Sequence, residues 1–422
     1  IGDQDDVTAL LDRRSDDELA KLMANLGGHC LSTLIQAFDN TKDDRPLCFI
    51  AYTIKGWGLP LAGHKDNHAG IMTPDQMATL QANMNIRDRR EWEPFEGLSV
   101  SQEEIEEFLS NVPFNARVRR RHAAATIPIE GFPKIEGARM STQEGFGKIL
   151  NEIAHCDAAF VDRIITTSPD VTVSTNLGAW VNYRNLFARQ ATADVFREEK
   201  VVSGQKWSFS PSGQHFELGI AENNLFLLLC AAGLAHSLFG ERLLPIGTVY
   251  DPFISRGLDA LNYACYQDAR FLLIGTPSGV TLAPEGGAHQ SVGAPLIGLS
   301  QDGLAAFEPA FVDELGVIIE WALEYMQRDG DSKRDETNWL RDATGGSVYI
   351  RCSTRQIDQI SREMSEDLKR QIINGAYWLR KPGPNCELVI AYQGVVAPEA
   401  IAAAGLAGED RRDIGVLAIT SS

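Results

Sequence analysis

The stretch FELGIAENNL, at residues 216–225, decides the fold, because the apolar run after it predicts a buried helix beginning near Glu222. Further along, Tyr250 and Phe253 lie in the segment YDPF, and His289 lies in the Gly-rich segment APEGGAHQ. Taken alone, Glu222 is an acidic residue in the first turn of a helix, where the helix dipole favours negative charge. A carboxylate, two aromatic rings and a histidine in this order also indicate a functional site, so both interpretations stay open here.

The composition is that of an ordinary globular protein and argues against several kinds of partner. Its 422 residues are 44% hydrophobic and 23% charged, which suits a chain of two or three domains. The net charge of −18 argues against nucleic acid or an anionic membrane surface as a partner. No stretch approaches the roughly 18 uncharged apolar residues of a membrane span. The seven cysteines form no CxxC motif, which is typical of reduced cysteines in a cytoplasmic protein.

The first part of the chain predicts one edge of a parallel α/β unit. A helix at 31–38 leads to an apolar run at 47–53, which we expect to form a strand. A long Gly-rich loop follows, and it contains Lys55, His64 and His68. Polar loops at the carboxyl ends of strands commonly carry function.

From residue 87 to 135, charges and prolines interrupt the pattern, so we expect a linker with one helix at 101–111. The basic run Arg119–Arg121 is interpreted as a solvated face of that linker. After it, alternating helix and strand patterns predict α/β architecture with parallel sheets flanked by helices. The expected helices are 142–154, 222–235, 311–327 and 398–407, and the expected strands are 163–168, 242–248, 271–276, 347–351 and 386–392.

Several common active-site motifs are missing from the sequence. It has no GxGxxG between a strand and a helix and no Walker A loop, which argues against a dinucleotide fold and a nucleoside triphosphatase. It has no GxSxG, so no serine hydrolase site is predicted. His64 and His68 are four residues apart but lie in a glycine loop, so their spacing does not indicate a metal site.

The order of several segments resembles that of the thiamine diphosphate enzymes of the transketolase superfamily. The resemblance is greatest to the homodimeric type of 2-oxo acid (pyruvate) dehydrogenase, decarboxylating component. It covers nearly the whole chain and rests on order and spacing, since no single motif is specific. The segments are GGH at 27–29, YTIKGWG at 52–58, NHAG at 67–70, SPDVTVSTNL at 168–177, GIAEN at 219–223, and 275–290.

The resemblance implies how thiamine diphosphate would be held. Glu222 would hydrogen-bond the ring nitrogen N1′ of its aminopyrimidine, which then removes the proton from the thiazolium C2 carbon. Tyr250 and Phe253 would stack on that pyrimidine. Asp170 would face the partner of a homodimer, and Lys55 would contribute to cofactor binding.

The resemblance also implies catalytic and substrate residues. His289 and His68 would donate protons or hydrogen bonds to a 2-oxo acid, and His68 would also reach the cofactor. Three further residues would contact substrate, namely His29, His64 and Glu285. Arg139 and Ser174 align with the phosphate-binding residues of transketolases, whereas Pro277 stands where transketolases carry a histidine for the sugar.

The implied domain organisation has three α/β parts. Residues 1–86 would be the C-terminal part of the diphosphate-binding domain, 87–135 a linker, 136–381 the pyrimidine-binding domain, and 382–422 the start of the transketolase C-terminal domain. The family binds Mg²⁺ through a Gly-Asp-Gly…Asn motif that this sequence lacks, so we expect the metal ligands outside this chain. Both ends look like those of a piece of a longer polypeptide, a partial set of ordered segments, or one half of a split enzyme.

Three functions are weighed on this basis. The favoured hypothesis is decarboxylation of a 2-oxo acid such as pyruvate, with acyl transfer to a lipoyl-bearing partner in a multienzyme complex. Its active site would lie between the subunits of a homodimer. The second is a transketolase that moves a two-carbon ketol unit between sugar phosphates. The third is a non-catalytic remnant or assembly subunit that binds no cofactor.

Overall fold

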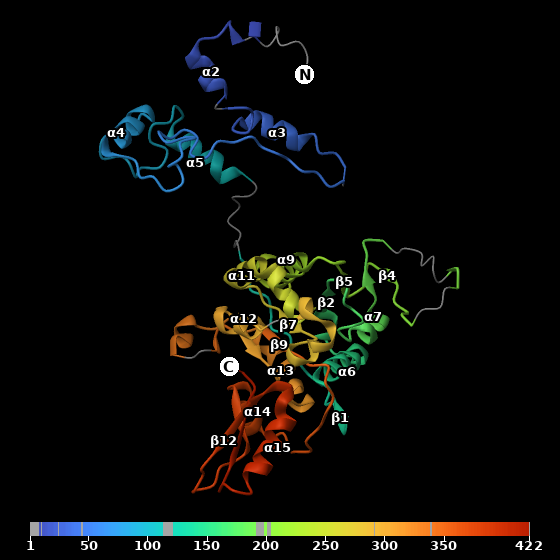
Figure 1. Ribbon diagram of the computed structural model, residues 1–422. Coiled ribbons are helices and arrows are strands. Elements are labelled where there is room, and N and C mark those ends of the chain that lie inside the picture. Colours follow the sequence, from blue (N-terminus) through green and yellow to red (C-terminus); the bar gives the residue numbers. More distant parts are fainter. Residues whose placement is uncertain are drawn as a thin grey trace. The chain divides into compact units, whose positions relative to one another are not determined.

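The computed structural model describes residues 8–9, 11–23, 25–43, 45–112, 121–190, 198–200, 204–290, 292–337 and 340–421. The chain divides into two compact units, 1–118 and 119–422 (Figure 1). Each unit is considered by itself below. Arg119 and Arg120 of the predicted linker face lie outside the described residues, and the proposed domain limits remain predictions.

The first unit is helical where the sequence predicts helices. Its helices are α2 (Asp16–Met23), α3 (Leu31–Asp39), α4 (Pro74–Asn83) and α5 (Gln102–Asn111). The α4 helix begins with a capping box in which Thr73 and Gln76 satisfy each other's backbone N–H groups. The prediction of a strand at 47–53 is wrong, because among residues 45–112 this extended segment has no neighbouring strand to pair with.

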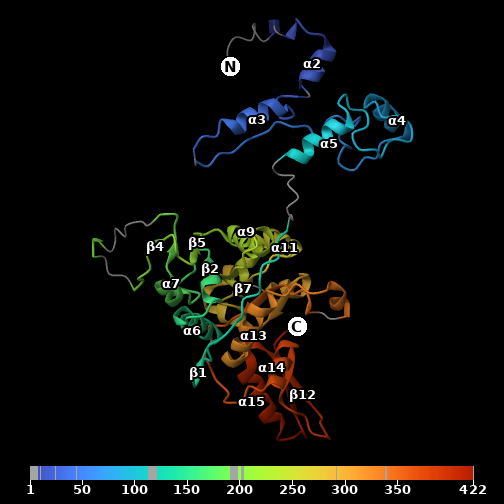
Figure 2. The same ribbon diagram turned by 180° about the vertical axis from the view of Figure 1, so that it is seen from behind.

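The second unit is built on one parallel sheet. Its order is β4-β3-β5-β2-β6-β7-β9-β8, and each described pairing is parallel. Helices lie on both faces (Figures 1 and 2), which confirms the predicted α/β class. The strands are β2 (Ile164–Ser168), β3 (Leu186–Phe187), β4 (Phe209–Ser210), β5 (His215–Glu217), β6 (Leu244–Val249), β7 (Leu272–Gly275), β8 (Leu304–Phe307) and β9 (Ser347–Arg351).

Two apolar cores lie on the two faces of this sheet. Leu272 and Ile274 of β7 belong to one core and Leu273 to the other, as the alternation of side chains along a strand requires. The first core contains α6 (Thr142–His155), α7 (Gly178–Arg184) and α13 (Val312–Tyr325), and the second contains α9 (Glu222–Gly233) and α11 (Leu258–Tyr266). Shorter helices are η2 (Val161–Arg163), α10 (Ala235–Leu238), η3 (Asp251–Gly257), η4 (Gly279–Glu285), η5 (Gly287–His289), α12 (Ala294–Ser300) and η6 (Ser332–Thr337).

The apolar helix expected over 222–235 forms, but the prediction that it is buried on most faces is wrong. Leu225, Phe226 and Leu229 of α9 are fully buried, whereas Leu227 is 54% exposed. The reason is that β6 and α11 cover only one side of the helix within this chain.

The C-terminal part of the second unit is a small sheet of order β11-β13-β12, in which β12 and β13 are parallel and β11 is antiparallel to β13. A two-stranded ribbon of β1 and β10 precedes it. None of the described helices is long and apolar enough to cross a membrane. The elements are β1 (Arg139–Met140), β10 (Ile357–Asp358), α14 (Glu366–Ile373), β11 (Ala376–Arg380), β12 (Val389–Gln393), η7 (Gly394–Val396), α15 (Ala397–Ala407) and β13 (Gly415–Ile419).

Candidate active site

The path of the chain places the candidate residues at a topological switch point. After β2 the chain builds β3, β4 and β5 on one side of it, and α9 then carries the chain over to β6 on the other side. Glu222 follows the carboxyl end of β5, and Tyr250 follows the carboxyl end of β6. In open parallel sheets, ligands bind at this edge and at such a point. The two residues that the sequence singles out therefore flank β2 where a ligand site is expected.

Glu222 is a buried carboxylate with one charged partner. It begins α9, and its side chain is 10% exposed. Arg256 of η3 donates from Nη1 to Glu222 Oε1 over 2.5 Å, and its guanidinium lies 3.8 Å from the centroid of the Phe253 ring. Phe253 and Arg256 are three residues apart in a 3₁₀ helix, where side chains at that spacing eclipse one another. The sequence alone did not identify Arg256.

The aromatic residues and His289 form a second part of the same cluster. The rings of Tyr250 and Phe253 are nearly parallel, at 7°, with centroids 5.8 Å apart. The His289 ring lies 5.1 Å from that of Phe253 and 6.1 Å from that of Tyr250. Glu285 Oε2 lies 4.0 Å from His289 Nε2. The structure thus brings together two carboxylates, two aromatic rings and one imidazole. These belong to Glu222, Glu285, Tyr250, Phe253 and His289.

A partly buried network supports the loop that carries Asp170. Asp170 has a left-handed φ of 60°, and its N–H donates to Glu217 Oε1 over 2.8 Å. Thr172 donates to the other oxygen of Glu217 over 2.7 Å and also contacts the fully buried His215 at 3.0 Å. Although burial raises the pKa of Glu217, hydrogen bonds from His215, Thr172 and the backbone of Asp170 and Gly219 lower it to about 2. Sequence reasoning missed His215 and Glu217, although Glu217 lies within the opening stretch.

A second buried network lies directly under Tyr250. Asp251 is fully buried and accepts from the hydroxyl of Tyr349 and from Arg351, whose Nη2 lies 3.1 Å away. Burial, together with the Asp251 charge, raises the pKa of the Tyr349 hydroxyl well above its usual value, so this hydroxyl stays a donor. Arg351 also binds Glu308, whose pKa is raised by burial despite this partner. The sequence offered one signal for this network, which is an aspartate directly after a buried strand.

Glu308 links this network to the C-terminal sheet. Its N–H donates to the carbonyl of Thr420 over 2.8 Å. Gly394 has a left-handed φ of +61°, and a Cβ there would lie 2.6 Å from Glu308 Oε1, so glycine is favoured at this position. The backbone that follows β12 therefore approaches the carboxylate directly.

The first unit gathers its own candidate residues. His29 Nε2 accepts from the N–H of Ile54 over 2.8 Å, and Lys55 Nζ contacts His68 Nδ1. His64 Nδ1 accepts from the N–H of Asp66 over 3.1 Å. Participation of these histidines in one site with Glu222 stays a prediction.

The two residues that favoured a sugar phosphate have other contacts. Arg139 of β1 is exposed, and its Nη1 lies 4.0 Å from Oδ1 of Asp358. Ser174 donates to the carbonyl of Val171 over 3.2 Å, and the Ser174 carbonyl accepts from Gln143 over 3.0 Å. Their predicted roles remain untested.

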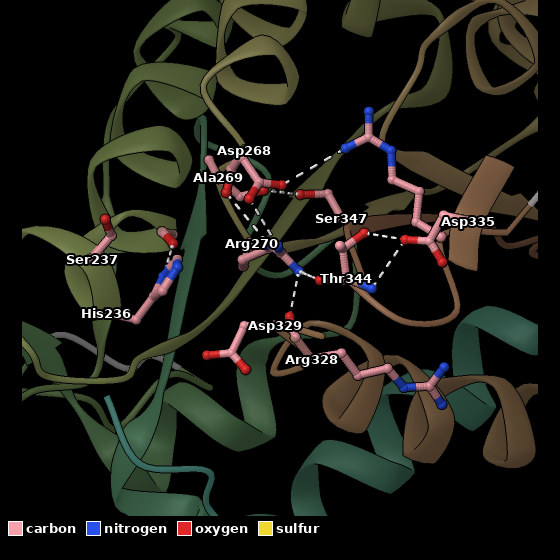
Figure 3. A network of polar contacts seen from close by, with 12 residues as sticks. His236, Ser237, Asp268, Ala269, Arg270, Arg328, Asp329, Asp335, Thr344 and Ser347 are labelled. Atoms are coloured by element: carbon pink, nitrogen blue, oxygen red, sulfur yellow. Dashed lines mark hydrogen bonds and ion pairs between the residues drawn. The ribbon is translucent and has the colours of Figure 1, made fainter. Parts of the chain in front are cut away.

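A further polar network lies at the opposite, amino edge of the sheet (Figure 3). Arg270, just before β7, is 5% exposed and donates to the carbonyls of Arg328 and Thr344 at 3.1 and 2.6 Å and to Asp268 at 2.8 Å. Ser347 donates to the carbonyl of Ala269 over 2.7 Å. These groups satisfy one another, so the network holds loops together and presents no open site. Among the described residues, no three His, Cys, Asp or Glu side chains gather closely enough to hold a metal ion.

Comparison with known proteins shows what this chain is similar to. The model of the pyruvate dehydrogenase E1 component middle domain matches residues 131–334, which include every residue of the Glu222 and His289 cluster. The pyruvate dehydrogenase E1 component of Cupriavidus necator is 24% identical over 422 aligned residues, covering 94% of this chain and 45% of the relative. These matches support a pyruvate dehydrogenase E1-like protein of the thiamine diphosphate transketolase superfamily.

A further relative and two solved structures are similar to this chain. The E1 component of Corynebacterium glutamicum is 23% identical, with 76% of this chain and 37% of the relative aligned. The E1-like chain therefore spans less than half the length of these relatives. Transketolases from Leishmania mexicana and Campylobacter jejuni share the fold, at TM-scores of 0.62 and 0.61 and identities of 17% and 14%. Each of these two matches covers 93% of this chain and 54% of the transketolase.

Proposed function

We propose that the second unit binds the aminopyrimidine of thiamine diphosphate and takes part in decarboxylating a 2-oxo acid such as pyruvate. The observation that carries this proposal is the contact set of Glu222. A buried carboxylate accepts an N–H from a flat group that stacks on Phe253, and that group is the Arg256 guanidinium. A pyrimidine ring also needs a flat stacking surface and a carboxyl group in its plane, so the residues fit it.

Each residue of the proposed site has its own role. Thiamine diphosphate, held by Glu222, Tyr250 and Phe253, would supply the electron sink for decarboxylation. Glu222 hydrogen-bonds the ring nitrogen of the pyrimidine and acts as its acid–base partner. Phe253 and Tyr250 fix the plane of the ring. His289, with Glu285 beside it, donates to the substrate carboxylate or carbonyl oxygen.

The remaining parts of the proposal come from the family resemblance. His68 and Lys55 bind the cofactor, His29 and His64 contact the substrate, and Asp170 faces a partner subunit. Mg²⁺ and its ligands come from outside this chain. The acyl group passes to a lipoyl-bearing partner of a multienzyme complex in the cytoplasm. The names of the E1 relatives support this reading over transketolase, since the transketolase matches speak for the fold alone.

The test uses full-length protein with Mg²⁺ and thiamine diphosphate. We expect pyruvate-dependent dye reduction and no ketol transfer from xylulose 5-phosphate. A Glu222→Gln variant should lose at least about 100-fold in activity, as expected for removal of an acid–base group. Arg163→Gln, which removes an exposed ion pair with Glu241, is the matched control and should keep full activity. Full activity of Glu222→Gln would refute the assignment of Glu222, and absence of both reactions and of cofactor binding would favour the non-catalytic alternative.

A further inference from the structure

Arg256 makes two contacts that a bound pyrimidine ring would also need. Its guanidinium lies at stacking distance over Phe253, 3.8 Å from the ring centroid, and donates to Glu222 Oε1 at 2.5 Å. A guanidinium is planar and carries N–H donors in its own plane. It therefore fills the stacking face and the carboxylate acceptor at the same time.

These two contacts cannot be shared with a second flat group. A guanidinium 3.8 Å above a ring leaves no space for another ring on that face, because stacked planes are themselves about 3.5–4 Å apart. Glu222 is 10% exposed, so its carboxylate has little open surface through which another donor could approach. The arginine and the ligand must then compete for one position.

The Arg256 side chain also has open space into which it can move. Its side chain is 50% exposed, in contrast to the 10% exposure of its partner Glu222. The contact over Phe253 is a single cation–π contact, which is individually weak, and a bound pyrimidine would take over the hydrogen bond to Glu222, so the side chain can turn outward as the ligand enters. By contrast, Arg351 in the neighbouring network is 7% exposed and paired with two carboxylates, which fixes it in place.

We propose that Arg256 is an internal plug, which holds the pyrimidine position through its contacts with Glu222 and Phe253 and swings into solvent when the cofactor binds. The plug keeps the buried carboxylate paired until the cofactor replaces it, since an unpaired buried charge would be strongly unfavourable. The plug also lowers the affinity for the cofactor, because the pyrimidine must displace the Arg256 side chain. This inference rests on the proposed binding of the pyrimidine at Glu222.

The experiment is a calorimetric titration of full-length protein with thiamine diphosphate in excess Mg²⁺. Arg256→Ala should bind roughly tenfold more tightly than wild type, as expected from the loss of one competing ion pair and one cation–π contact. Arg256→Lys, which keeps the charge but not the flat group, should fall between the two. A folding defect cannot produce a gain in affinity, and loss of a positive charge alone would weaken binding of an anion.

Two controls separate the possible results. Mg²⁺-pyrophosphate, which lacks the pyrimidine, should not bind more tightly to Arg256→Ala than to wild type, and Arg163→Gln should leave both affinities unchanged. Equal or weaker binding of thiamine diphosphate by Arg256→Ala, with binding abolished in Glu222→Gln, would overturn the plug and leave the proposed function standing. If no variant binds thiamine diphosphate, the proposed function and the plug both fail.

Discussion

The ion pair of Asp251 and Arg351 gives the sharpest prediction on stability. Asp251 is fully buried and Arg351 is 7% exposed, and Arg351 Nη2 lies 3.1 Å from Asp251 Oδ2. Replacing Arg351 with methionine leaves a buried carboxylate whose charge is no longer compensated, which costs about 3–5 kcal/mol. Because folded domains are stable by only about 5–15 kcal/mol, this is a large fraction of the total.

Urea unfolding of wild type, Arg351→Met, Asp251→Asn and the double variant measures this effect. The double variant should recover part of the loss, because the charge of Asp251 is gone while Glu308 still lacks its partner Arg351. Arg163→Met is the control, since its pair with Glu241 is 43% and 65% exposed and should contribute about 0–1 kcal/mol. A loss below about 1 kcal/mol for Arg351→Met, equal to that of the control, would refute the reasoning.

Two further predictions concern the neighbourhood of Glu222. The pKa of Glu217, lowered from 4.5 to about 2, means stability that is present above pH 4.5 and lost as the pH falls toward 2. Glu217→Gln should therefore be less stable than wild type by about 2 kcal/mol at pH 7, a value reduced to allow for the partial exposure of Glu217. Urea titrations should show that this difference in stability shrinks below about pH 4.5. A difference that stays constant with pH would contradict the prediction. Gly257→Ala would place its Cβ 2.4 Å from the Phe226 ring and 3.0 Å from the Glu222 carbonyl oxygen. This variant should therefore destabilise the protein by about 1–3 kcal/mol in thermal unfolding. Gly316→Ala is the control and should not destabilise it, because a Cβ at Gly316 meets open space.

The parts of the fold that the sequence predicts well have strong local signals. The capping box at Ser141 and Glu144 opens α6 as expected, and the apolar run at 347–351 is β9. The strands β3, β4 and β5 were missed because two or three residues are too few to show a period. The prediction of a strand at 47–53 was wrong for a different reason. An apolar run forms a strand only where a neighbouring strand can pair with it.

Some residues of the candidate site could be predicted from the sequence and others could not. Glu222, Phe253 and His289 could be selected because each lies in a recognisable segment, and the structure brings them together. Arg256 lies 34 residues from Glu222 in sequence, so only the fold reveals the pair. Its position three residues after Phe253 would have placed it beside that ring, had a 3₁₀ helix been expected there.

The contacts of Glu308 have a consequence for how two parts of the second unit depend on each other. Through Thr420 and Gly394, the segments after β13 and β12 touch a carboxylate whose partner, Arg351, also binds Asp251 next to Tyr250. Docking of the small C-terminal sheet and ordering of the segment that carries Tyr250 are therefore coupled through one arginine.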